Sequence, residues 1–254
     1  MAVPSDIEEL LFLFRPGQPD PPKKWTGARK AVVIAVSLLL VIIFLQAANS
    51  QGLLNLSGDY TQTYSWTYNG SNWTFSERIP NSAYDHYRSQ PKTYDFASYV
   101  TKSDTIVDRL AVGLKGEADQ YGYNTAQFIL SFVQNIPYGT DENTTGTSNY
   151  PRYPVETLVD GIGDCKDHST LFVSLMESPT VNTDMVLLWV IPATGDNHIA
   201  AGIVAGEYGS YYSSPTSFQY HGTDYYYCET TSPGWTIGEM PLQFEGCQVQ
   251  ILPC

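Results

Sequence analysis

A change of hydrophobic period near residue 180 constrains the fold of this chain more than any single motif does. Between residues 103 and 176, apolar side chains recur every three or four positions, which is the period of helices with one buried face. After residue 185, short apolar runs rich in β-branched and aromatic residues indicate strands. Helices followed by strands predict an α+β domain, in which helices pack on an antiparallel sheet.

Three helices and three strands are expected within this domain. The helices begin near Asp104, Asn124 and Cys165, and Pro137 ends the second one because proline cannot continue a helix. The segment DENTTGTSN is rich in turn residues and is expected to be a loop. The strands are expected at residues 185–191, 199–204 and 225–229.

Residues 60–79 form a separate pattern, in which aromatic and polar side chains alternate as they do in half-buried strands. Asn69-Gly70 in the middle is a strong signal for a tight turn between two strands. We therefore expect a β-hairpin, which either stands off a membrane or packs on the main domain.

An apolar run at residues 31–48 (AVVIAVSLLLVIIFLQAA) contains no charged side chain. As a helix it would be about 27 Å long, close to the thickness of a hydrocarbon core. Basic residues precede it and none follows before Arg78, so residues 1–30 are expected in the cytoplasm and the remainder outside. The alternative is a cleaved signal peptide, with Ala47 and Ala48 near the cut.

The predicted organisation is thus a single-pass protein of the cell membrane with an extracellular α+β domain. It has a cytoplasmic tail (1–30), a transmembrane helix (31–48), an extracellular linker with the hairpin (49–94) and the α+β domain (95–254), which also contains the candidate catalytic residues given below. The net charge of −13 argues against nucleic acid as a partner, because the phosphates would be repelled. The sequence leaves open the oligomeric state and a disulfide between Cys247 and Cys254.

The segment GIGDCKDHS contains a candidate nucleophile, Cys165. Its glycines permit a tight turn into a helix that Asp164 can cap. Cys165 then lies in the first turn, where free N–H groups and the positive end of the helix dipole stabilise a thiolate and can also bind an oxyanion. The carboxylates of Asp164 and Asp167 oppose the thiolate, and Lys166 offsets part of their charge.

A thiol nucleophile also needs a base and a group that orients the base. His198 opens the strand HIAAGIV and can face the helix N-terminus across a cleft. Glu229 ends the next expected strand and can accept a hydrogen bond from the His198 ring. Gln134 and Tyr138 are candidate side-chain oxyanion donors. No metal or other cofactor is expected.

Three blocks carry a family resemblance: GDCKDHSTL, NHIAAG and YYYCETTSPGWTIGE. Their order resembles the Cys-His-Asp/Glu order of transglutaminase-like (papain-like) cysteine domains, in particular the archaeal membrane-anchored members, over residues 95–245. The resemblance implies an α+β core with the cysteine on a helix and the histidine and the acid on adjacent strands. It departs from the family at Lys166, often acidic in relatives, at His168, unusual there, and at Glu229, where most members have aspartate.

Thiol acyl chemistry is what this resemblance implies: peptide hydrolysis, amidation or crosslinking through a thioester. We favour hydrolysis of a protein or peptide at the cell surface, because water is always present and no amine site is recognisable. One alternative is an inactive domain of this fold that binds or organises the cell envelope. A second is a zinc site built on Cys165 and His168, although further ligands are not obvious. Trp235 is expected in the cleft or in the core.

Overall fold

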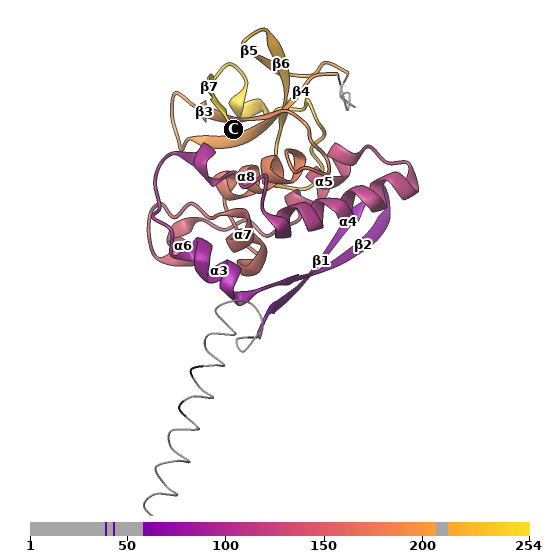
Figure 1. Cartoon of the computed structure of the whole chain (residues 1–254). Coiled ribbons are helices and arrows are strands. Elements are labelled where there is room, and N and C mark those ends of the chain that lie inside the picture. The colour runs from indigo at the N-terminus through magenta and orange to yellow at the C-terminus, as the bar shows by residue number, and fades with distance from the viewer. Residues whose placement is uncertain (1–38, 40–42, 44–57, 207–212) are drawn as a thin grey trace, which may run out of the picture. The chain divides into compact units, whose positions relative to one another are not determined.

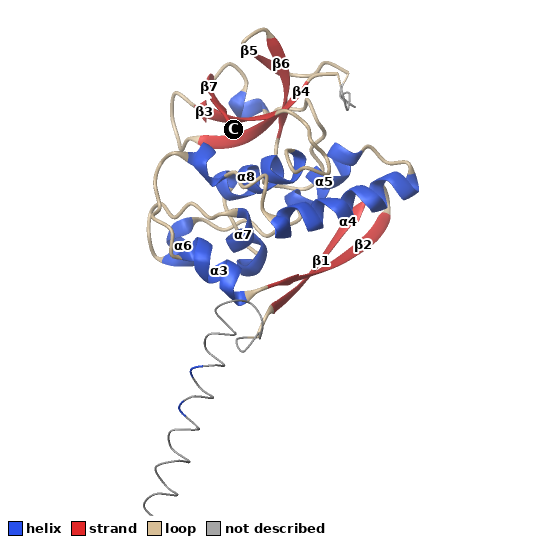
Figure 2. Cartoon of the chain, in the orientation of Figure 1, coloured by secondary structure: helices blue, strands red, loops and turns tan. Residues whose placement is uncertain are grey.

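The computed structural model describes residues 58–206 and 213–254, together with Leu39 and Ile43 (Figure 1). The chain divides into two units, residues 1–56 and 57–254, and the account below concerns the second. Its described part contains a two-stranded hairpin, six α-helices and a five-stranded antiparallel sheet (Figure 2). The prediction of an α+β domain is confirmed.

The hairpin consists of β1 (Tyr60–Tyr68) and β2 (Ser71–Ile79), which pair antiparallel along their whole length. Asn69 and Gly70 both have positive φ angles, 49° and 75°, as a tight turn between twisted strands requires. Trp66 is buried, and its ring centroid lies 5.4 Å from that of Phe132. The predicted hairpin is therefore present, and it packs on the domain.

The three expected helices are confirmed, and each begins at a capping side chain. Asp104 caps α4 (Thr105–Tyr121), Asn124 caps α5 (Thr125–Gln134) and Asp164 caps α8 (Cys165–Met176). Short helices occur where none was expected, including one in the turn-rich segment: α3 (Asn81–Arg88), α6 (Asp141–Thr145), α7 (Pro154–Asp160) and the 3-10 helices η1 (Phe96–Tyr99) and η2 (Leu242–Phe244).

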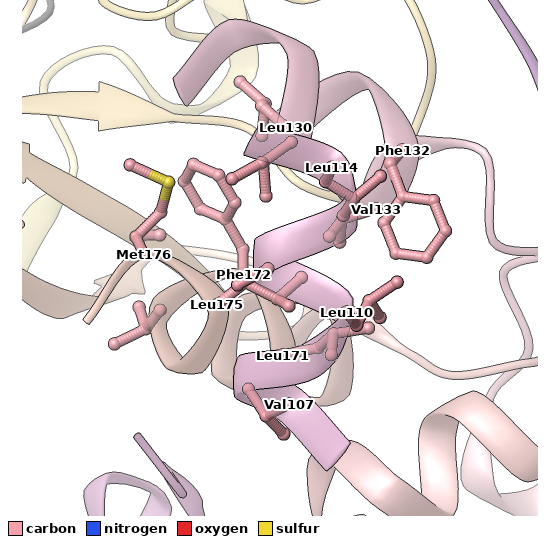
Figure 3. Packing of buried hydrophobic residues seen from close by; sticks show 14 of the residues in the cluster. Val107, Leu110, Leu114, Leu130, Phe132, Val133, Leu171, Phe172, Leu175 and Met176 are labelled. Atoms are coloured by element: carbon pink, nitrogen blue, oxygen red, sulfur yellow. The ribbon is translucent and has the colours of Figure 1, made fainter. Parts of the chain in front are cut away.

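The core forms where α4, α5 and α8 meet, and side chains from all three helices pack together there (Figure 3). Helix α8 also contacts β3 and β4, so it is covered on two sides. All of its residues after Cys165 are buried, the polar ones included. The labelled side chains of this cluster are aliphatic or aromatic: Val107, Leu110, Leu114, Leu130, Phe132, Val133, Leu171, Phe172, Leu175 and Met176.

The five-stranded sheet has the order β5-β6-β4-β3-β7, and every neighbouring pair is antiparallel. Its strands are β3 (Met185–Ile191), β4 (His198–Val204), β5 (Ser217–Tyr220), β6 (Thr223–Cys228) and β7 (Gln248–Pro253). The three expected strands correspond to β3, β4 and β6, and the two edge strands were not expected. Because β4 and β6 are antiparallel neighbours, the start of β4 meets the end of β6.

The predicted transmembrane helix is corrected by the structure. Among the described residues, no helix combines the length and the apolar character that crossing a membrane requires. The longest of them, α4, has 17 residues and carries charged side chains such as Asp108 and Arg109. The single-pass location and the extracellular placement, which depended on that helix, are withdrawn with it. Apart from Leu39 and Ile43, residues 31–48 lie outside the described part of the chain.

Candidate active site

Two reciprocal hydrogen bonds place Cys165 in the first turn of α8. The Asp164 carboxylate accepts from the N–H of Asp167 at 3.5 Å, and the Asp167 carboxylate accepts from the N–H of Asp164 at 3.2 Å. The Asp164 carboxylate also accepts from the N–H of Lys166 at 3.1 Å. This is a capping box, which fixes where the helix begins. No described group accepts a hydrogen bond from the Cys165 N–H, so it is available at the helix N-terminus.

The backbone before Cys165 is held against a second segment. The Gly163 carbonyl accepts from the Gly139 N–H at 2.9 Å, and the Gly163 N–H donates to the Pro137 carbonyl at 3.2 Å. A Cβ atom on Gly163 would lie only 2.8 Å from the Cβ of Asp167, so no larger residue fits there. These contacts place Tyr138 beside the thiol.

His198 links Cys165 to Glu229. Its Nε2 atom lies 3.0 Å from the Glu229 carboxylate oxygen Oε2, and the Cys165 thiol is close enough to raise the pKa of the imidazole. Because Nε2 is occupied by Glu229, the nitrogen that remains for the thiol is Nδ1. His198 opens β4 and Glu229 directly follows β6, so the antiparallel pairing of these strands explains why the two side chains meet.

Glu229 is buried among hydrogen-bond donors. Its Oε2 atom also accepts from the Tyr227 hydroxyl at 2.9 Å, while Oε1 accepts from the Thr231 N–H at 3.0 Å and the Thr231 hydroxyl at 2.6 Å. Burial alone would raise the pKa of Glu229, but the bonds from His198 and Thr231 and the His198 charge lower it to about 2. The carboxylate therefore remains ionised across the neutral range.

The charged form of His198 is stabilised by the two groups that flank it. Burial would lower the pKa of His198, but its interaction with Cys165 and its hydrogen bond to the Glu229 carboxylate raise it to about 9. One face of the imidazole stacks on Phe244 of η2, with ring centroids 4.5 Å apart and an interplanar angle of 14°. The Phe244 ring thereby limits the tilt of the imidazole between its two partners.

A buried ionic network lies under the N-terminus of α8, and Arg152 is its centre. The guanidinium is 2 % exposed and lies 3.2 Å from Asp141, 3.0 Å from Asp160 and 3.0 Å from Asp167. The Lys166 ammonium binds Asp141 at 2.6 Å and also bonds to Asp164. Asp164 and Asp167 do oppose a thiolate in principle, but each has a cationic partner in the structure.

We expect Arg152→Met to destabilise the fold by about 3–5 kcal/mol, because it leaves buried carboxylates without their cation. Urea unfolding of the full chain measures this loss. Lys115→Met serves as the control, since it removes the partially exposed pair with Asp119 within α4 and should cost less than about 0.5 kcal/mol. Equal losses in the two variants would contradict this account of Arg152.

The two candidate oxyanion donors lie in different surroundings. Gln134 is buried, and its side-chain nitrogen donates to the backbone carbonyls of Glu229 at 2.8 Å and of Trp235 at 3.0 Å. Both of its N–H groups are therefore engaged away from the thiol. Tyr138 is 51 % exposed and lines the cleft that contains Cys165. Burial of its hydroxyl and the charge of Cys165 raise the pKa of Tyr138 to about 12, so it remains a donor.

His168 lies one turn after Cys165 and is fully buried. Its Nδ1 atom is 3.2 Å from the Thr230 carbonyl oxygen, and burial lowers the pKa of His168 to about 4, so it is neutral. Within the described residues, the one group of three potential metal ligands is the set of carboxylates Asp141, Asp164 and Asp167, in which the Lys166 and Arg152 cations already lie. His168 does not belong to that group.

The thiol opens into a cleft of about 450 Å³. Aromatic side chains form one part of its wall, namely Tyr94, Phe96, Tyr138 and Trp189. Acidic side chains lie along another part, namely Asp141, Glu142, Asp164 and Asp196. Trp235 lines a different cavity, so neither sequence expectation for it describes its position. All four cysteines are free thiols.

Sequence reasoning missed several residues that support the site. Tyr227 and Thr231 both hold Glu229, Phe244 covers His198, and Arg152 neutralises the acids below the helix. Tyr227 and Thr231 lie within two residues of Glu229, which is a signal that could have been used. Nothing in the sequence indicates that Arg152 is buried or that the Phe244 ring reaches His198.

Comparisons with known proteins identify no family for this chain. No protein-family model matches the chain, and no curated protein matches its sequence. A similar solved structure bears the name "Putative Cysteine Protease from Cytophaga hutchinsonii"; it is 12 % identical, with a TM-score of 0.33, and the match covers 77 % of this chain and 72 % of that chain. At this level the likeness carries no argument about activity, and nothing in the comparisons supports an archaeal origin.

Proposed function

We propose that this chain is a cysteine-dependent enzyme that hydrolyses amide bonds of proteins or peptides. One observation carries the proposal: the His198 imidazole lies 3.0 Å from the buried carboxylate of Glu229, and the Cys165 thiol is close enough to raise the pKa of that imidazole. A nucleophile, a base and a group that orients the base are the minimum for acyl transfer through a thiol.

In the acylation step, the Cys165 sulfur attacks the amide carbon and the carbonyl oxygen becomes negative. The N–H of Cys165 and the hydroxyl of Tyr138 are the proposed donors to this oxygen. The His198 imidazolium gives its proton to the amide nitrogen, the C–N bond breaks, and the amine leaves with that proton. The acyl group remains on sulfur as a thioester.

In the second step, neutral His198 removes a proton from a water molecule, whose oxygen attacks the thioester carbon. The C–S bond breaks, the carboxylic acid leaves, and the thiolate and the imidazolium are restored. Glu229 keeps its charge throughout and holds the imidazole in position. We propose water rather than an amine as the acceptor because water is always present, and no described group forms a distinct amine site.

The proposal is tested by incubating the full chain with an unbiased peptide mixture in heavy-oxygen water and identifying the products by mass spectrometry. We expect products that carry one heavy oxygen in a new carboxyl group and that are absent with Cys165→Ala. Joined peptides without heavy oxygen would instead establish transamidation. No product, together with a Cys165 thiol that is alkylated no faster than Cys247, would overturn the proposal in favour of a non-catalytic binding domain.

A further inference from the structure

A second cavity of about 640 Å³ lies apart from the thiol cleft and shares no lining residue with it. Three segments build it: the end of β1 with its turn, the α4–α5 connection with the side of α5 that carries Gln127, Ser131 and Gln134, and the loop after β6. None of its lining side chains is charged, in a chain whose net charge is −13. A volume of this size is typical of sites for small organic ligands.

The wall combines aromatic rings with carboxamides. Trp235 is half-buried and lines the cavity, so part of its indole is exposed there. Tyr123 is held rigid, because it packs between neighbouring rings such as Phe128, with centroids 5.8 Å apart. Asn69 on the turn and Asn135 at the end of α5 also line the cavity. The Asn135 nitrogen donates to the Ser131 carbonyl at 2.8 Å, which leaves its oxygen for a ligand.

Buried side chains fix the position of Trp235. Its backbone carbonyl accepts from the amides of Gln127 at 3.1 Å and Gln134 at 3.0 Å, and both glutamines are more than nine-tenths buried. Gln127 also accepts from the Ile237 N–H at 2.9 Å, and the indole N–H donates to Ser232 at 3.0 Å. A loop held in this way loses little entropy when a ligand binds, so the aromatic surface is preorganised.

These features select a ligand class. Without Arg or Lys in the wall, phosphate and sulfate groups have no oppositely charged partner there, and without Asp or Glu neither do cations. Carboxamides both donate and accept hydrogen bonds, as sugar hydroxyls do. The negative face of an indole also suits the slightly positive C–H face of a pyranose ring. We propose that this cavity binds an uncharged oligosaccharide, with Trp235 as the stacking surface and Asn69 and Asn135 as hydroxyl partners.

The cavity is connected to the thiol site through Gln134. The same side-chain nitrogen that holds Trp235 also donates to the Glu229 carbonyl, and Glu229 and Trp235 belong to one loop. A saccharide on Trp235 would thus lie near the chain that positions the acid. This binding site does not depend on the proposed hydrolase activity, because its lining residues take no part in that reaction.

The test is isothermal titration of the full chain with cellohexaose, chitohexaose and maltohexaose. We expect at least one of them to bind, and Trp235→Ala to weaken that binding about tenfold or more, the effect of losing one stacking contact. Trp235→Phe should retain part of the affinity. Tyr94→Ala, which removes an exposed aromatic ring of the other cleft, should leave the affinity unchanged.

Hexagalacturonate and an Ala-Asn-Gly peptide that is acetylated and amidated, and therefore uncharged, serve as the competing probes. The proposal is wrong if no neutral hexasaccharide binds at concentrations up to about 10 mM, a very weak affinity, or if Trp235→Ala binds it as tightly as wild type. Binding of only the charged sugar or only the peptide would also overturn it. Should Trp235→Ala fail to fold, Asn135→Ala provides the same comparison, since Asn135 is half-buried at a helix end.

Discussion

Alkylation of Cys165 at pH 6 is expected to slow about 100-fold when His198 is replaced by alanine, since an ordinary thiol is almost fully protonated at that pH. In the wild type, the pKa of His198 is raised to about 9, so its imidazole is positively charged at pH 6. A positive charge near Cys165 favours the thiolate form of the thiol. The measurement is the rate of iodoacetamide labelling of the full chain between pH 5 and pH 9.

Two controls make this result specific. Cys165→Ala gives the background labelling of the other three cysteines, of which Cys228 is buried. His221→Ala removes an exposed histidine outside the site and should leave the rate unchanged. If His198→Ala labels as fast as the wild type at pH 6, the two residues do not form an activated pair, and the hydrolase proposal loses its main support.

Glu229→Gln is expected to reduce kcat by about 10²- to 10⁴-fold, the loss typical of an orienting carboxylate replaced by its amide. The amide keeps the size of the side chain but removes the charge that raises the pKa of His198. The imidazolium should therefore lose its proton at a lower pH, and the pH profile of Cys165 alkylation should change with it. A variant whose activity and pH profile both match the wild type would show that Glu229 has no such role.

Stability measurements on the same variant provide an independent readout. The pKa of His198 is about 9 in the folded chain, above its ordinary 6.5. Its contribution to the free energy of unfolding is therefore complete below pH 6.5 and is lost as the pH rises through 9. The pKa of Glu229 is about 2, below its ordinary 4.5. Its contribution to the free energy of unfolding is therefore complete above pH 4.5 and is lost as the pH falls through 2. The stability difference between wild type and Glu229→Gln should thus be widest between pH 4.5 and 6.5.

Local signals account for the parts of the fold that the sequence predicts. Asp104, Asn124 and Asp164 each cap a helix through their own side chain, and such caps are visible without tertiary knowledge. The turn at Asn69-Gly70 is similarly local. The edge strand β7 (Gln248–Pro253) was missed because its pairing with β3 joins residues more than fifty positions apart and its apolar alternation is weak.

The candidate site also contains features that local sequence signals predict and features that depend on distant residues. Cys165, His198 and Glu229 were chosen from sequence blocks, and the fold brings them together, while their catalytic role remains a prediction. The direction in which a side chain points could not be predicted from these blocks. Gln134 was considered as an oxyanion donor, but its amide is consumed by two backbone carbonyls, because a buried helix face decides which way it points. The burial of Arg152 likewise depends on carboxylates contributed by three helices.

The buried network around Arg152 also restricts how this protein can evolve. Losing Arg152 while Asp141 and Asp167 remain leaves buried carboxylates without their cation, so that single change passes through a damaged intermediate. Mutations at these positions are therefore epistatic: the loss of Arg152 becomes tolerable only after the aspartates have changed. Among diverging descendants of this chain, the arginine and its aspartates should be inherited or lost as a block, while the exposed Lys115–Asp119 pair drifts freely.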